Sequence, residues 1–228
     1  ELKKQPANFI TGYYRTREMF GAALFGGAIK RAATVSFRGK TFSTAGADGK
    51  SLFATDHPSK LDKAKQQSNC FADAFSNKAL AAMETEMQNR TGDNGELLAV
   101  APDTIWIPND AALKDKVFSA IGADKEPTSA NNAYNYQFGR WNVIVDPYMT
   151  KALKDLGKTD VPFFLLDSHF IQMADAAIFQ DRVKLEVRSV LDENNDNNVW
   201  KGFSRFGAGF VDWRFISAGN MSTGTDLT

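Results

Sequence analysis

The chain has 228 residues, which is enough for one large or two small domains with a sizeable core. Apolar residues make up 43% and charged residues 24%, as is ordinary for a soluble globular protein. Its 27 basic residues balance 27 acidic residues, which argues against a protein whose main task is to grip nucleic acid along one basic face. Zero net charge is compatible with self-assembly, because copies do not repel one another at long range.

A single cysteine, Cys70, excludes an internal disulfide. We interpret it as a small buried side chain rather than a nucleophile, since cysteine is among the most buried residue types. No apolar run reaches the roughly 18–20 residues that span a bilayer, and no signal peptide is evident. The chain begins at Glu1, which suggests an excised leader, a cloned fragment or a front end that is not included.

The first third predicts an arm, a helix and a hairpin. Residues 1–14 are irregular and predict an extended arm, whereas residues 15–30 have helical spacing weakened by glycines. Residues 34–42 alternate and are rich in β-formers, so Gly39-Lys40 is expected to close a short hairpin. Gly46 to Gly49 is expected to close a second short hairpin.

The middle of the chain predicts a polar loop followed by a well-defined helix. Residues 58–69 contain almost nothing apolar and predict a solvated loop. Ser76 is suited to cap a helix that runs through Arg90. The apolar stripe of this helix is formed by Ala79, Leu80, Met83 and Met87.

Three short apolar strands are expected next, at residues 104–108, 141–147 and 162–167. The last is apolar enough to be covered on both faces. Asn109 or Asp110 is expected to cap a helix that ends at Ile121, and a polar loop follows over residues 124–135.

The C-terminal part predicts a long hairpin. Residues 183–191 alternate apolar and charged side chains, as in a strand with one wet face. A polar turn at 192–198 leads into a return strand over 203–216, with Val211, Trp213 and Phe215 expected on one face. A two-stranded hairpin needs a cover or a partner for its faces and edges.

Candidate chemistry is weak. Asp56 stands beside His57, and His169 follows a strand, but neither sits in a recognisable catalytic pattern. We favour a structural loop around His57, whose backbone Pro58 pushes toward extended geometry. The polar turn at 192–198 lacks the glycine and glutamate of a calcium-binding EF-hand loop, so a hairpin tip is favoured over a metal site.

Gly202, Gly207 and Gly209 do not form a dinucleotide fingerprint, because no helix follows them. Glycines in a strand more often permit a bend or a close approach of another backbone.

Without a catalytic pattern around His57, the segment 48–69 is interpreted as a glycine-hinged polar loop that lies across a neighbouring copy.

A series of short motifs occurs in a recognisable order. It comprises Asp48-Gly49, Leu52-Phe53, His57-Pro58, Ser68-Asn69, the helix to Met87, Gly95-Glu96-Leu97-Leu98, residues 102–108, residues 142–147, residues 163–167 and residues 206–214. In this order the chain resembles the Mu-type major head subunits of tailed bacteriophages. The resemblance covers Asp48 to Arg214; the arm before it and the tail after it match nothing recognisable.

The resemblance implies an α+β chain with the Hong Kong 97-type capsid fold. Its parts would be an N-terminal arm and helix (1–33), an extended β-hairpin loop (34–69), an axial domain (101–178), and a peripheral domain (70–100 and 179–228). The peripheral domain would hold a spine helix and the long hairpin. Removal of a leader during maturation is a further implication.

The implied function is a structural major capsid protein of a virion assembled in the host cytoplasm. Hexamers and pentamers would close into an icosahedral head around double-stranded DNA, without enzymatic activity, cofactor, metal or membrane. Portal, scaffolding or decoration proteins are further candidate partners. We expect inter-subunit contacts from Phe37, Arg38, Phe42, Phe53, His57, Lys60 and Lys63, and sequence-blind DNA contacts from Arg15, Arg17, Lys30 and Arg31.

Two alternatives remain open. An encapsulin-like compartment shell would keep the fold but enclose a protein cargo. A hydrolase that uses His57 or His169 belongs to a different class.

Overall fold

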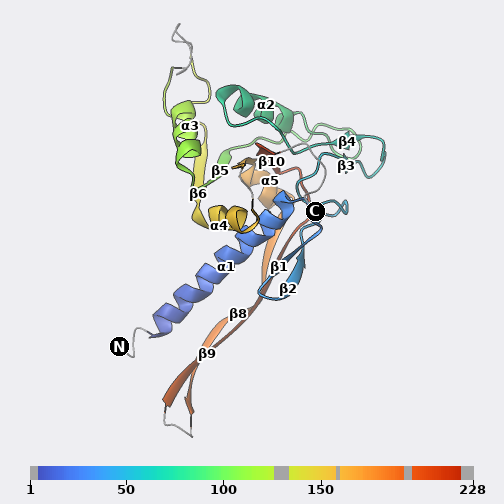
Figure 1. Ribbon diagram of the computed structural model, residues 1–228. Coiled ribbons are helices and arrows are strands. Elements are labelled where there is room, and N and C mark those ends of the chain that lie inside the picture. The colour runs from blue at the N-terminus through green and yellow to red at the C-terminus, as the bar shows by residue number, and fades with distance from the viewer. Residues whose placement is uncertain (1–4, 126–133, 158–159, 193–196, 222–228) are drawn as a thin grey trace.

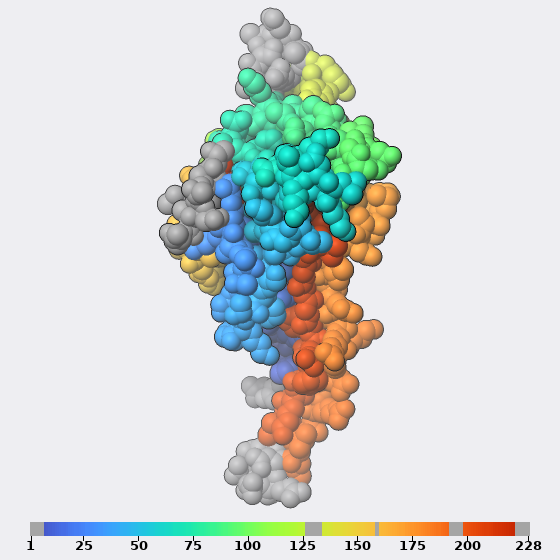
Figure 2. Space-filling view, turned by 90° about the vertical axis from the view of Figure 1, so that its right-hand side faces the viewer, coloured from blue at the N-terminus to red at the C-terminus, as the bar shows by residue number. Residues whose placement is uncertain are grey.

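A computed structural model describes residues 5–125, 134–157, 160–192 and 197–221. The protein is α+β, as expected, and it is elongated (Figures 1 and 2). A body of helices around a four-stranded sheet forms one end. From it the helix α1 (Gln5–Ile29) and a ribbon of two long strands, β8 (Ala177–Asp192) and β9 (Asn197–Phe210), extend together toward the other end.

The helix α1 begins at Gln5, so the extended arm expected over residues 1–14 is wrong for the described part of that segment. Contacts with the ribbon explain the difference. The ring of Phe9 occupies the space where a Cβ on Gly202 would lie, within 2.2 Å of two ring atoms. Arg17 donates to both carboxylate oxygens of Asp181, at 3.0 and 2.9 Å. The ribbon thus supplies the stabilisation that this glycine-weakened helix lacks by itself.

A short hairpin of β1 (Thr34–Phe37) and β2 (Lys40–Ser43) follows. Arg38 and Gly39 form its two-residue turn with φ of 49° and 77°, the geometry that matches the twist of paired strands. The predicted hairpin is confirmed, with its turn one residue earlier than expected. Phe37 and Phe42 lie against Phe20 of α1, with ring centroids 5.5 and 4.7 Å away.

The body is built on a sheet with the strand order β10-β7-β5-β6. Its strands are β5 (Thr104–Pro108), β6 (Asn142–Asp146), β7 (Phe163–Leu166) and β10 (Ile216–Gly219). Only the β5–β6 pair is parallel; β7 pairs antiparallel with both β5 and β10.

An aspartate caps each helix that follows one of these strands. Asp110 caps α3 (Ala111–Ile121), Asp146 caps α4 (Pro147–Asp155), and Asp167 caps α5 (Ser168–Met173). In each case the carboxylate accepts a backbone N–H of the first turn, which satisfies a donor that the helix leaves unpaired. The prediction of α3 is confirmed, whereas α4 was not predicted; Pro147 begins that helix, where its missing N–H costs nothing.

The helix α2 (Asn77–Gln88) is capped by Ser76 as predicted, and its expected apolar stripe is buried. Two very short strands, β3 (His57–Pro58) and β4 (Gln66–Gln67), pair at the base of the polar loop.

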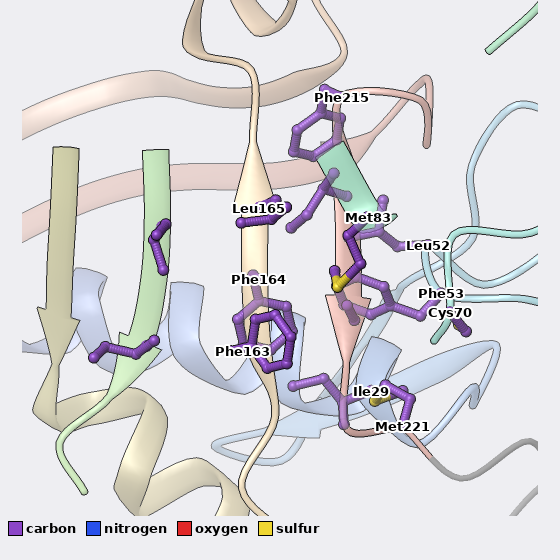
Figure 3. Close-up of a cluster of buried hydrophobic side chains, with 14 of the residues drawn as sticks. Ile29, Leu52, Phe53, Cys70, Met83, Phe163, Phe164, Leu165, Phe215 and Met221 are labelled. Carbon is purple, nitrogen blue, oxygen red and sulfur yellow. The ribbon is translucent and has the colours of Figure 1, made fainter. Parts of the chain in front are cut away.

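The core lies on both faces of β7, as predicted for residues 162–167. Figure 3 shows Phe163, Phe164 and Leu165 among side chains from distant parts of the chain, including Ile29, Leu52, Phe53, Met83 and Phe215. All of these are at most 2% exposed. One continuous core thus joins the N-terminal, middle and C-terminal segments. Burying each such side chain contributes about 1.5–3 kcal/mol to the free energy of unfolding.

The ribbon begins at Ala177, six residues before the predicted start. Its expected alternation of half-buried and exposed positions is confirmed over residues 183–188, but Leu191, expected on the half-buried face, is 55% exposed. The return strand ends at Phe210, not at Ile216, which belongs to β10. Val211 is exposed while Trp213 and Phe215 are buried in the body, so the shared face expected for these three is wrong. Residues 193–196 of the expected turn, and 126–133 of the expected polar loop, lie outside the described residues.

Candidate assembly surfaces

His57 lies at the centre of the 48–69 segment and is only 1% exposed. Its Nδ1 lies 2.6 Å from Asp48 Oδ2, and its Nε2 lies 3.3 Å from Asn69 Oδ1. The imidazole stacks on the indole of Trp213, with centroids 4.1 Å apart and planes 7° from parallel. The adjacent Asp56 pairs with Lys50 instead, so the expected neighbour in sequence is not the partner in space.

The electrostatics of this group come from burial and hydrogen bonding acting in opposite directions. Burial alone would raise the pKa of Asp48, but the hydrogen bonds from His57 and from the N–H of Lys50 outweigh it and lower that pKa below its ordinary value. The carboxylate is therefore held ionised beside the ring. Since both ring nitrogens and one ring face are occupied within the chain, His57 fixes a turn.

Asn69 ties the two ends of the segment together. Its Nδ2 donates to the carbonyl of Leu52 at 2.7 Å, and its Oδ1 accepts the N–H of Ala54 at 3.1 Å. Leu52 and Phe53 are fully buried. The expectation that 48–69 is one projecting loop with little to pack against its own subunit is therefore wrong, because residues 51–54, His57 and Asn69 are buried against the body.

The part that does project is short. Residues 60–66 are all exposed, and Leu61 is 75% exposed. Asp93 holds their base: its Oδ1 accepts the N–H of Lys60 at 3.1 Å, and its carbonyl accepts the Ser59 hydroxyl at 3.0 Å. The Lys60 N–H lowers the pKa of Asp93, burial partly offsets this, and Arg214 lowers it further.

A surface cleft of about 380 Å³ lies beside this loop. Its lining includes both basic and acidic side chains. Figure 2 shows the loop in cyan at the front of the molecule. The cleft is lined by Ala47, Asp48, Pro58, Ser59, Lys60, Lys63, Asp93, Ala174, Val211, Asp212, Trp213 and Arg214.

Arg90 is buried and links two distant segments of the chain, a role that the sequence analysis did not predict. Its guanidinium donates to the carbonyls of Arg214 and Ile216, at 2.6 and 3.1 Å, and to the Ser217 hydroxyl. Burial lowers the pKa of Arg90 to about 9, with partial compensation from Glu86 and Asp212. It thereby joins the end of α2 to β10, a connection of more than 120 residues that no local pattern signals.

The residues predicted to touch neighbours fall into three groups. Phe53 and His57 are buried, which corrects their expected place on an exposed loop. Phe37 and Phe42 are half-buried against Phe20 and anchor the β1–β2 hairpin to its own α1. Arg38, Lys60 and Lys63 are exposed.

The residues predicted to face DNA lie on or just after α1. Arg15 is exposed, and Lys30 and Arg31 are half-exposed at the end of the helix. Arg17 is bonded to Asp181 and lies over the Phe179 ring, 4.3 Å from its centroid. Its charge is compensated within the subunit, which a sequence pattern could not show.

The remaining candidate residues, His169 and Cys70, also lie outside any catalytic arrangement among the described residues. His169 is exposed on the first turn of α5, and Asp167 caps that helix and accepts the N–H of Ala101. Cys70 is buried in the core. Among the described residues, no three His, Cys, Asp or Glu side chains gather as metal ligands would, and no helix is long and apolar enough to cross a membrane.

Comparison with known families defines the class. The profile of the family described as phage capsid protein matches residues 17–218, and the chain belongs to that family. It is accordingly a structural protein of the bacteriophage virion, in the major capsid class. A search of curated proteins found no match.

Proposed function

We propose that this chain is a Mu-type major head subunit with the Hong Kong 97-type fold. Copies would assemble in the host cytoplasm into hexamers and pentamers of an icosahedral head around double-stranded DNA. The observation that carries the proposal is the family match over residues 17–218 on a chain whose α1 and ribbon extend far from its body.

The proposed division of the chain assigns α2 and the ribbon to a peripheral domain (70–100 and 179–228), and residues 101–178 to an axial domain. Residues 1–33 would be the arm and helix, and 34–69 the extended loop. Because β10 pairs with β7, the last described strand of the peripheral part completes the sheet of the axial part. We therefore propose that the peripheral and axial domains differ in their role in the shell but share one hydrophobic core.

Exposed groups support the assembly surfaces that we propose. Arg38, Lys60 and Lys63 are candidates for polar contacts at the rim of subunit interfaces, where such pairs contribute little individually. A subunit held by several neighbours needs only modest interfaces, because the contacts act together. Arg15, Lys30 and Arg31 are candidates for phosphate contacts, which would be sequence-blind and salt-dependent.

We expect no catalytic activity. His57 is enclosed by Asp48, Asn69 and Trp213, an arrangement that supports a structural role. Portal, scaffolding or decoration proteins remain candidate partners.

Assembly is tested with the purified chain over a wide range of concentrations. Light scattering coupled to gel filtration, followed by electron microscopy, should reveal closed particles with rings of five and six subunits. A subunit that stays monomeric at every concentration would contradict the proposal. Particles that enclose protein rather than duplex DNA when isolated from cells would favour the compartment shell.

A further inference from the structure

Three aromatic side chains project from a short segment that follows α3. Tyr134, Tyr136 and Phe138 are 79%, 51% and 46% exposed, whereas the intervening Asn135 and Gln137 are 5% and 2% exposed. The segment thus alternates, with amides inward and aromatic rings outward. We call residues 134–140 the aromatic loop.

Asn135 fastens the first half of the aromatic loop to the end of α3. Its Nδ2 donates to the carbonyls of Ala120 and Ala123, at 2.6 and 3.0 Å. Its Oδ1 accepts the N–H of Gln137 at 3.1 Å. These bonds satisfy carbonyls at a helix end that would otherwise lack donors.

The second half is fastened to α2 through Glu84, a buried carboxylate on the apolar face of that helix. Glu84 accepts from Gln137 Nε2 at 2.8 Å and from Arg140 at 2.5 Å. Gln137 in turn accepts the indole N–H of Trp141 at 2.6 Å. Two helices therefore hold the loop, and its rings are presented with little conformational freedom to lose on binding.

We propose that the aromatic loop is a contact surface for a second copy of this chain. The inference rests on the proposed function, since it names residues through which copies meet. Large aromatic side chains on a rigid backbone are the residue types that dominate protein–protein contacts.

Duplex DNA is the poorer occupant for chemical reasons. Its bases are stacked inside the helix, and its accessible phosphates call for cations rather than tyrosine and phenylalanine rings. Arg140, the cation within the loop, is paired with Glu84 and lies near the Tyr136 ring, with its guanidinium carbon 5.9 Å from the centroid. The loop therefore offers aromatic surface without an uncompensated positive charge of its own.

The size of the surface favours a repeated contact over a stable pair. With about 200 Å² for each side chain, the three rings expose roughly 350 Å² in total. A stable two-protein interface buries about 1,200–2,000 Å². The aromatic loop alone is too small for that, but it suits one of several contacts that hold a subunit among neighbours.

The position of the loop agrees with such a contact. Figure 2 shows it in yellow-green at the upper end of the body, at the opposite end of the molecule from the ribbon. A neighbour that meets this end leaves α1 and the ribbon free for other contacts.

Hydroxyl-radical footprinting tests the occupant directly. We expect Tyr134 and Tyr136 to be at least about fivefold less reactive in particles assembled without nucleic acid than in the dilute subunit. Unchanged reactivity in particles that do form would overturn this inference and leave the capsid function standing. Protection of the dilute subunit by a short DNA duplex would overturn it too, in favour of nucleic acid. If no particles form at any concentration, the proposed function fails and this inference fails with it.

Variants provide a second test with a matched control. The double change Tyr136→Ala with Phe138→Ala should raise the concentration at which particles appear by about tenfold or more. Tyr136→Phe, which keeps the ring, should stay within about twofold. Thermal unfolding of the dilute subunit should be the same for all three proteins, because these side chains are exposed. Assembly of the double variant at the wild-type concentration would contradict the proposal.

Discussion

The body and the ribbon of this subunit are stabilised in different ways. In the body, β7 is covered on both faces, and polar groups such as Asn69 and Asp167 are bonded to the backbone inside. The ribbon has two strands, and its side chains are half-buried on one face and exposed on the other over residues 183–188. A two-stranded ribbon is marginal by itself. The body, which includes the buried end of α1, therefore has a core of its own, whereas the ribbon depends on the rest of α1 and, in our proposal, on neighbouring copies.

Removing a core ring should have the largest effect. Phe164 is fully buried between Phe53 and Trp106, with centroids at 5.5 and 5.1 Å. Phe164→Ala should lower the free energy of unfolding of the dilute subunit by about 3–5 kcal/mol, because it removes buried surface and leaves a cavity. Urea denaturation measures this loss.

Phe203→Ala is the matched control on the ribbon, where the side chain is 61% exposed. We expect its effect on the dilute subunit to be within about 0.5 kcal/mol. Equal losses for the two variants would contradict the distinction between body and ribbon.

The two aspartates near His57 should differ. Asp48→Asn weakens a hydrogen bond to the buried ring and should cost about 1–3 kcal/mol. Asp56→Asn breaks only the half-exposed pair with Lys50 and should cost less than about 1 kcal/mol. Denaturation of both variants at neutral pH measures the difference. The reverse order would mean that Asp56 orients the ring.

The contribution of Asp48 to stability should depend on pH. Because the pKa of Asp48 is lowered in the folded state, the unfolded chain takes up its proton at a higher pH than the folded chain does. The stability that Asp48 contributes is therefore complete above its ordinary pKa of about 3.8 and is lost as the pH falls below that value. Denaturation between pH 6 and pH 2.5, taken here as roughly the window of carboxylate titration, should show a shallower decline for Asp48→Asn. An unchanged slope would contradict the assignment.

A small global effect with a distinct local one is expected where α1 meets the ribbon. Arg17→Ala removes a largely shielded ion pair and should cost about 1 kcal/mol or less in total stability. Its effect should appear locally, as faster hydrogen exchange in residues 5–17 and in β8, with β7 unchanged. Faster exchange in β7 would show that residues 5–17 and the ribbon do not open separately from the body.

Local patterns predicted the elements whose signals are local. Ser76 and the stripe from Ala79 to Met87 sufficed for α2, and alternation sufficed for the middle of β8. The start of α1 could not be found in this way, because Phe9 is supported by Gly202, almost two hundred residues later.

The site shows the same limit. A histidine beside an aspartate drew attention to Asp56, but the fold brings Asp48 and Trp213 to the ring. The alternation of Tyr134, Asn135, Tyr136 and Gln137 is visible in the sequence, yet its meaning depends on Glu84 and the end of α3. The partners of His57 and the orientation of the aromatic loop are set by contacts between distant segments, which composition and local patterns do not reveal.

Hydrogen exchange compared between the dilute subunit and assembled particles tests the central claim most directly. We predict that β7 exchanges slowly and equally in both, while residues 5–17 of α1, the ribbon and the aromatic loop gain further protection in particles. Equal exchange of the ribbon in both states, or a β7 that gains its protection only on assembly, would contradict the account of a self-sufficient body with extensions completed by neighbours.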